Sequence, residues 1–129
     1  MRLIELTIRV LCEVRPRSIV DGAVLYCQTI DNQHSVFRAA REIIHRNLAR
    51  KVLIQNSGPV SGYPGFSVWK SELEKIGIPG SRIDGINTAE MNSLNTLIES
   101  EAVIPYAVNK GLRSLYVVSA PFHQLRAFM

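Results

Sequence analysis

Short apolar runs, separated by stretches with helical spacing of apolar residues, constrain the fold of this chain more than any other feature. Three such runs cover residues 22–27, 51–55 and 112–119, and a fourth short strand is expected at residues 82–86. Continuous apolar runs of this length are typical of strands buried on both faces, as in a parallel sheet. We therefore predict an α/β fold, a three-layer Rossmann-like sandwich with a mostly parallel sheet.

The stretches between the runs carry the apolar spacing of amphipathic helices. Helices are predicted over about residues 34–49, 66–76 and 89–109. Gly77 is the glycine expected just past the second helix, and Pro105 is expected to kink or split the third. The residues of the third helix expected to face the core are Leu94, Leu97, Ile98 and Val103.

Chain length and composition indicate one domain. With 129 residues the chain has room for one core; we expect an amphipathic helix within residues 1–19 that packs on an α/β domain of residues 20–129. The two cysteines, Cys12 and Cys27, are too few for a disulfide scaffold and suggest buried free thiols in a reduced, cytoplasmic setting. No apolar run approaches the ~20 residues of a membrane-spanning helix, so no transmembrane segment is expected.

The positive charge of the chain is modest. The net charge is +4, and residues 1–50 contribute most of it, with eight arginines against five acidic residues. Arg38, Arg41 and His45 share one stripe of the 34–49 helix, but no aromatic residues that could stack on bases are interleaved with them. This pattern favours a solvated helix face, and no nucleic-acid partner is predicted. The histidines lack the paired spacing of zinc ligands, so no metal site is predicted.

Polar side chains follow three of the predicted strands, at the edge where an open parallel sheet binds its ligands. These polar ends are residues 28–32, 56–58 and 119–123. Serine, asparagine and glycine are ordinary turn and cap residues, but beside helix N-termini they can also hold an anion. The candidate ligand-binding residues at these ends are Ser57, Gly58 and Ser119.

His123 and Arg126 follow the last apolar run and are three residues apart, so on a helix they would face the same way. A histidine that titrates near neutrality, placed beside a fixed cation, suits phosphate binding or proton transfer. If the protein catalyses a reaction, we assign proton transfer to His123 and charge stabilisation to Arg126. Neither an enzymatic activity nor a cofactor follows from the sequence.

A polar cluster at the start of the long predicted helix has two interpretations. Ser93 or Asn95 can cap the helix while Glu99 pairs locally. Alternatively, Asn95, Thr96 and Glu99 face a ligand, since helical spacing puts them on one side of the helix. The residue pattern allows both.

Several segments, taken in order, resemble the YdcF/SanA/ElyC-like family, a domain of unknown function. The most specific are the Asn95-Thr96 segment and Ser-x-x-x-His-x-x-Arg-Ala at residues 119–127, and the similar region covers about residues 20–129. The resemblance implies a Rossmann-like domain linked to bacterial cell-envelope and lipid-carrier metabolism. Carried over position by position, it implies a site lined by Arg38, Ser57, Gly58, Asn95, Thr96, Glu99, His123 and Arg126.

The chain departs from the pattern of this family in three places. Residues 28–32 stand where relatives have a glycine-rich turn, and Pro59 replaces a second glycine after Ser57 and Gly58. Relatives also continue past the His-x-x-Arg-Ala segment with a further strand and helices. The resemblance therefore implies a C-terminally truncated or minimal member.

The leading hypothesis is a domain that binds a phosphorylated or nucleotide-like small molecule, an anionic ligand, at the carboxyl ends of its strands. S-adenosylmethionine is an alternative ligand, but no carboxylate ends the strand at residues 51–55 to hold its ribose hydroxyls. A noncatalytic interaction module that dimerises through an exposed apolar edge is the alternative of another class. These hypotheses lead us to ask whether Ser57, Asn95, His123 and Arg126 converge in space.

Overall fold

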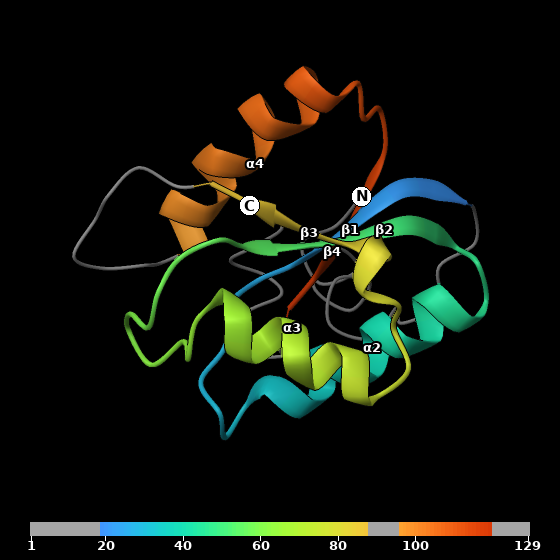
Figure 1. Cartoon of the computed structure of the whole chain (residues 1–129). Helices are drawn as coiled ribbons and strands as arrows, with labels where there is room; N and C mark the ends of the chain where they lie inside the picture. The colour runs from blue at the N-terminus through green and yellow to red at the C-terminus, as the bar shows by residue number, and fades with distance from the viewer. Residues whose placement is uncertain (1–18, 88–95, 120–129) are drawn as a thin grey trace, which may run out of the picture.

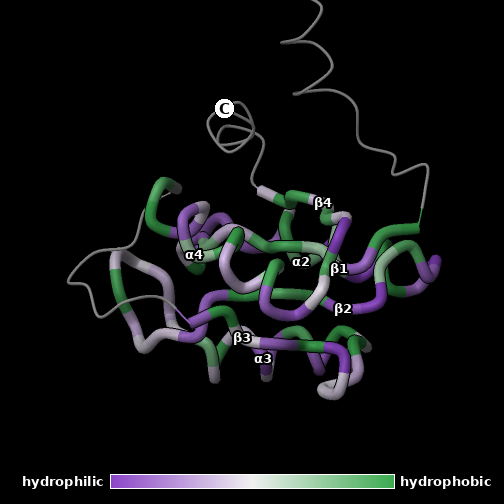
Figure 2. The backbone as a smooth tube through the Cα atoms, turned by 90° about the horizontal axis from the view of Figure 1, so that it is seen from above, coloured by the Kyte–Doolittle hydropathy of each residue, from purple (hydrophilic) through white to green (hydrophobic). Residues whose placement is uncertain are grey.

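The computed structural model describes residues 19–87 and 96–119, and its strands form one parallel sheet between helices (Figure 1). The strands are β1 (Val20–Leu25), β2 (Ala49–Gln55), β3 (Ile83–Ile86) and β4 (Leu115–Val118). Their order across the sheet is β3-β2-β1-β4, as seen from above in Figure 2. Every strand pair is parallel, which confirms the predicted parallel α/β fold and the short strand near residues 82–86.

Helices cover both faces of this sheet and complete the three layers. The helices α2 (Gln33–His45) and α3 (Phe66–Lys75) lie on one face, and α4 (Thr96–Lys110) lies on the other (Figure 1). A short 3-10 helix, η1 (Gly80–Arg82), leads into β3. Within the described part of the chain, no helix has the length and apolar character needed to cross a lipid bilayer.

The strand order determines where a ligand crevice is expected. The chain builds β1, β2 and β3 outward in one direction, and α4 then carries it back across the sheet to β4 on the other side of β1. The direction of winding therefore reverses between β1 and β4. In doubly wound sheets, ligands bind beside such a reversal, at the carboxyl ends of the strands.

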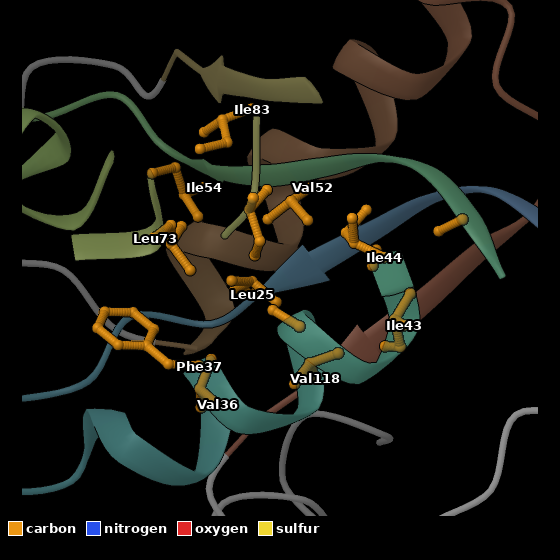
Figure 3. Close-up of a cluster of buried hydrophobic side chains, with 14 of the residues drawn as sticks. Leu25, Val36, Phe37, Ile43, Ile44, Val52, Ile54, Leu73, Ile83 and Val118 are labelled. Carbon is orange, nitrogen blue, oxygen red and sulfur yellow. The ribbon is translucent and has the colours of Figure 1, made fainter. Parts of the chain in front are cut away.

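The larger core lies between the sheet and the helices α2 and α3 (Figure 3). Trp69 of α3 is fully buried there, and its ring makes edge-on contacts with Phe37 and Tyr63 at centroid distances of 5.0 and 4.9 Å. The indole N–H of Trp69 donates to Gln33 Oε1 at 3.1 Å, so the buried polar atom is satisfied. These contacts fasten the start of α2 to α3.

A smaller core lies under α4 on the opposite face of the sheet. Val24, Leu53 and Ile86 form its buried centre, and Val103 and Tyr106 of α4 are among the side chains packed against it. Leu53 therefore faces α4, whereas its neighbours Val52 and Ile54 face the larger core. This alternation is the one expected of a strand covered on both sides.

The end of α2 differs from the prediction. A helix was expected to reach residue 49, but α2 ends at His45, and Ala49 is already the first residue of β2. Asn47 adopts a positive φ of 53° in the turn between them. The prediction was wrong because Ala49 pairs with Val20 of β1, and this long-range pairing outweighs the local helical pattern. Gly77 behaves as expected, with φ 103° just after α3.

Two expectations concern helix α4. Pro105 was expected to kink or split the helix, and the split is wrong, because α4 runs through this residue. Leu97 was expected to face the core but is 66% exposed. Leu97, Ile104 and Val108 are all exposed, and their spacing places them on one outer stripe of the helix. The helix thus carries apolar residues on both faces, and its sequence does not distinguish the face that meets the sheet.

The last apolar run was expected to form a fully buried strand, and this was wrong. It forms only β4, an edge strand whose Val117 is 52% exposed. Other predictions, namely the N-terminal helix, Cys12, the helix start at residues 89–95 including Leu94, and the segment from residue 120 onward, lie outside the described residues.

Candidate ligand site at the carboxyl edge of the sheet

The residues after β1 begin a buried polar region at the carboxyl edge, on the side where α4 starts (Figure 1). The backbone N–H of Tyr26 donates to the carbonyl of Val118 at 2.9 Å, which holds the ends of β1 and β4 together. The hydroxyls of Tyr26 and Ser100 are 2.7 Å apart, a hydrogen bond that fastens α4 to the same point. Gln28 is 3% exposed. Polar groups are therefore enclosed beside the reversal of strand order.

Glu99 brings a carboxylate from α4 to the end of β1. It lies in the first turn of the helix and is 4% exposed, and its Oε1 accepts the backbone N–H of Cys27 at 2.6 Å. Burial raises the pKa of Glu99 to about 7, although hydrogen bonds from Cys27 act in the opposite direction. A carboxyl that exchanges a proton near neutral pH therefore lies at this edge. The bond joins residues 72 positions apart, so Glu99 does not pair only locally.

Tyr63 approaches the same place from the loop after β2. Its hydroxyl donates to the carbonyl of Gln55 at 2.9 Å, and the phenol and the Cys27 thiol are also hydrogen-bonded. Cys27, Tyr63 and Glu99 therefore lie together at this edge.

Burial is the largest cause that raises the pKa of both the Cys27 thiol and the Tyr63 phenol, and the neighbouring Glu99 adds to it. Both groups are therefore protonated at neutral pH. Because the thiolate is the nucleophilic form of cysteine, Cys27 is not an activated nucleophile here.

Two buried polar atoms at the end of β2 lack a hydrogen-bond partner in the described structure. They are Gln55 Oε1 and Ser57 Oγ. Gln55 is 1% exposed, and strand alternation directs it toward α4, because Leu53 faces α4 and Ile54 faces the larger core. A buried polar group left unpaired costs about 1–3 kcal/mol, so these two atoms have hydrogen-bonding capacity that the described residues do not use.

The loops around these atoms are closely packed. A Cβ added at Gly62, whose φ is +82°, would lie 2.8 Å from Thr29 Cγ2, so the loops after β1 and β2 touch. The side-chain amide of Asn56 donates to Asn87 Oδ1 at 2.9 Å, which ties the ends of β2 and β3 together. The carbonyl of Ser57 accepts the backbone N–H of Phe66 at 2.9 Å. The start of α3 is therefore held beside Ser57.

The structure brings some of the predicted site residues to this edge. Ser57 and Glu99 lie there, and Ser119, 6% exposed, directly follows β4. Gly58 is exposed in the loop after β2, and a Cβ on it would meet nothing within 4 Å. Arg38 lies on the exposed face of α2, as do Arg41 and His45. Thr96 is the first residue of α4; the predicted residues outside the described part are Asn95, His123 and Arg126.

Sequence reasoning missed the roles of Gln55 and Tyr63, and it saw Cys27 only as a free buried thiol. Cys27 is free and partly buried. A polar residue that closes a buried apolar run, as Gln55 does, is a signal that could have been used; Tyr63 carried no comparable signal. The described residues contain no group of three or more histidine, cysteine, aspartate or glutamate side chains that could hold a metal ion.

Comparisons with protein-family models, with curated proteins and with solved structures find no match to this chain. The resemblance seen in its motifs therefore stays a prediction. The geometry of the carboxyl edge is what supports a function.

Proposed function

We propose that this protein binds a phosphorylated or nucleotide-like small molecule at the carboxyl ends of β1 and β2, beside the start of α4. The observation that carries the proposal is the pair of buried atoms Gln55 Oε1 and Ser57 Oγ, which have no hydrogen-bond partner among the described residues. They lie at the edge where the strand order predicts a ligand. Two independent features, the reversal of strand order beside β1 and the unpaired hydrogen-bonding capacity at the end of β2, thus support the same edge of the sheet.

The start of α3 supports an anionic group in this ligand. The helix begins at Phe66, whose backbone N–H is bonded to the carbonyl of Ser57, and helix N-termini carry a partial positive charge that favours phosphate. His123 and Arg126 belong to the same proposal as residues for proton transfer and charge stabilisation. Glu99 adds a buried group with a pKa of about 7, which suits general acid-base chemistry.

Two finer expectations form part of this proposal. The resemblance to the YdcF/SanA/ElyC-like family supports a ligand from cell-envelope or lipid-carrier metabolism, such as a polyprenyl phosphate. The free thiol of Cys27 supports a reduced, cytoplasmic location.

Isothermal titration calorimetry with inorganic phosphate, ribonucleoside diphosphates and a polyprenyl phosphate tests the proposal. We expect saturable binding of at least one of these probes. The affinity should fall by about tenfold or more in Ser57→Ala and in Arg126→Ala, since a lost hydrogen bond or ion contact of about 1.4 kcal/mol has this effect. Ser71→Ala, on the exposed face of α3, is the matched control and should bind as the wild type does.

Absence of saturable binding for the whole set of probes would contradict the proposal. Binding that is unchanged in both Ser57→Ala and Arg126→Ala would also contradict it, because the ligand would then occupy another place.

S-adenosylmethionine is a second candidate ligand, and Glu99 is the observation that favours it. The sequence offered no carboxylate at the end of the second strand, but the structure places the Glu99 carboxylate 2.6 Å from the Cys27 amide nitrogen, at the end of β1. Calorimetry with S-adenosylmethionine beside the phosphate probes distinguishes the two candidates. Binding of S-adenosylmethionine with no binding of any phosphate probe would favour the second.

A further inference from the structure

The two unpartnered atoms in the described part of the site can both accept a hydrogen bond. The amide oxygen Gln55 Oε1 can only accept, and the Ser57 hydroxyl can accept as well as donate. Glu99 accepts bonds from the backbone N–H and the thiol of Cys27, and its ionised form retains lone pairs for more. The Tyr63 hydroxyl, a donor from the loop after β2, is already used by the carbonyl of Gln55.

The cationic side chains of the sheet lie at its other edge. Lys51, near the start of β2, pairs with Asp84 at 2.9 Å, and Arg82, at the end of η1, donates to the carbonyls of Ala49 and Arg50 at 2.7 and 2.9 Å. An ionised phosphate presents acceptors only, so it would place acceptor against acceptor at Gln55 Oε1 and at the ionised form of Glu99. The phosphate of a ligand is therefore poorly suited to this buried corner.

A sugar ring has the complementary chemistry. Each hydroxyl of a vicinal diol carries one donor and two acceptor lone pairs, so two adjacent hydroxyls can donate to Gln55 Oε1 and to Glu99 while one of them also bonds Ser57 Oγ. Gln55 is 1% and Glu99 is 4% exposed. Bonds made at this depth are shielded from competing water, and leaving these groups unpaired is costly.

We propose that Gln55, Ser57 and Glu99 form a subsite for the vicinal hydroxyls of the sugar ring of a nucleotide-like ligand, with the phosphate held outside this corner. The inference rests on the proposed function and names the part of the ligand that enters the buried end of the site.

Pairs of probes that differ only in these hydroxyls test the subsite. Ribonucleoside diphosphates of the four common bases are titrated beside their 2′,3′-dideoxy counterparts, with calorimetry on the full chain. We expect at least one ribonucleotide to bind at least tenfold more tightly than its dideoxy counterpart. A site that hydrogen-bonds buried hydroxyls rejects analogues lacking them, because its polar groups are then left unpaired.

Variants locate the effect. In Gln55→Leu and in Ser57→Ala the preference for the hydroxylated probe should shrink at least threefold, whereas Ser71→Ala should retain it. If Gln55→Leu does not fold, Ser57→Ala and the probe pairs on the wild type still decide the question.

The outcomes separate the inference from the proposed function. Equal affinity for both members of every pair would overturn the subsite and leave phosphate binding at this edge intact. Binding of inorganic phosphate or polyprenyl phosphate, with no ribonucleotide binding at all, would likewise overturn only the subsite. Failure of every probe would overturn both.

Discussion

The two edges of the sheet differ in how they treat their polar groups. At the amino edge, charged side chains are partly exposed and have partners. Lys51 pairs with Asp84, and the carboxylate of Asp21 accepts the backbone N–H of Arg113 at 2.8 Å. At the carboxyl edge, polar groups are buried, and Gln55 Oε1 and Ser57 Oγ have no partner among the described residues.

This difference is the physical basis of our proposal that a ligand binds at the carboxyl edge. At the amino edge, Lys51, Asp84 and Asp21 find their partners within the described part of the chain. The carboxyl edge retains buried hydrogen-bonding capacity and a carboxyl with a raised pKa, Glu99, both of which cost folding free energy. Such a cost is typical of functional sites.

The largest difference between the two edges is expected in how the free energy of unfolding depends on pH. The pKa of Glu99 is about 7 in the folded chain against an ordinary value of 4.5, so the folded state binds the proton more tightly. The stabilisation that protonated Glu99 gives the folded state is therefore fully present below about pH 4.5, and it is lost as the pH rises through 7. The difference between the folded and ordinary pKa values corresponds to about 3 kcal/mol in the free energy of unfolding. Urea unfolding at several pH values should show this fall in the wild type and not in Glu99→Gln.

A control and an opposite case accompany this measurement. Glu101→Gln, on an exposed position of α4, should retain the pH dependence of the wild type. At the amino edge, the hydrogen bond from the Arg113 backbone lowers the pKa of Asp21 below its ordinary 3.8. Its contribution is therefore present above that pH and lost in stronger acid, so Asp21→Asn should flatten only the acid limb. A Glu99→Gln profile parallel to the wild type would contradict the account.

Two serine substitutions should change stability in opposite directions. Ser57→Ala removes a buried hydroxyl that has no partner in the described part of the chain and should raise the free energy of unfolding by about 1 kcal/mol. Ser114→Ala removes a hydroxyl that accepts the backbone N–H of Asp21 at 3.2 Å and should lower it by about 0.5 kcal/mol, because the Ser114 carbonyl still accepts the same N–H at 3.1 Å. Urea titrations at one pH measure both. Equal losses in the two variants would mean that Ser57 Oγ is satisfied within the chain.

The smallest effect is expected from the ion pair at the amino edge. Side-chain exposures of 44% for Lys51 and 34% for Asp84 imply strong screening, so Asp84→Asn should cost only about 0.5 kcal/mol and less in high salt. Denaturation at low and high ionic strength measures this, with Glu42→Gln on the exposed α2 pair as the control. A loss above about 2 kcal/mol would show that the amino edge contributes far more than a solvated pair.

Much of the fold was predictable because its signals are local. Apolar runs and glycines such as Gly77 mark strands and helix ends within a few residues. The wrong predictions concern competition between distant segments: Ala49 joins the sheet because it pairs with Val20, and Leu97 faces outward although both sides of α4 are apolar.

The candidate site was predictable in location more than in composition. Ser57 and Glu99 were proposed from polar residues near strand ends and helix starts. Tyr63 was missed because its role depends on contacts with Cys27 and Gln55, which a loop sequence does not reveal. The bond between Cys27 and Glu99 spans 72 positions, so only the folded chain brings these groups together.

Nuclear magnetic resonance mapping of a bound ribonucleoside diphosphate tests the central claim most directly. If the carboxyl edge is the binding edge, saturating ligand should shift the amide signals of Cys27, Gln28, Ser57 and Glu99. The signals of Val20, Lys51 and Ile83 at the amino edge should stay unchanged. Shifts gathered at the amino edge, or no shifts at millimolar ligand, would contradict the account.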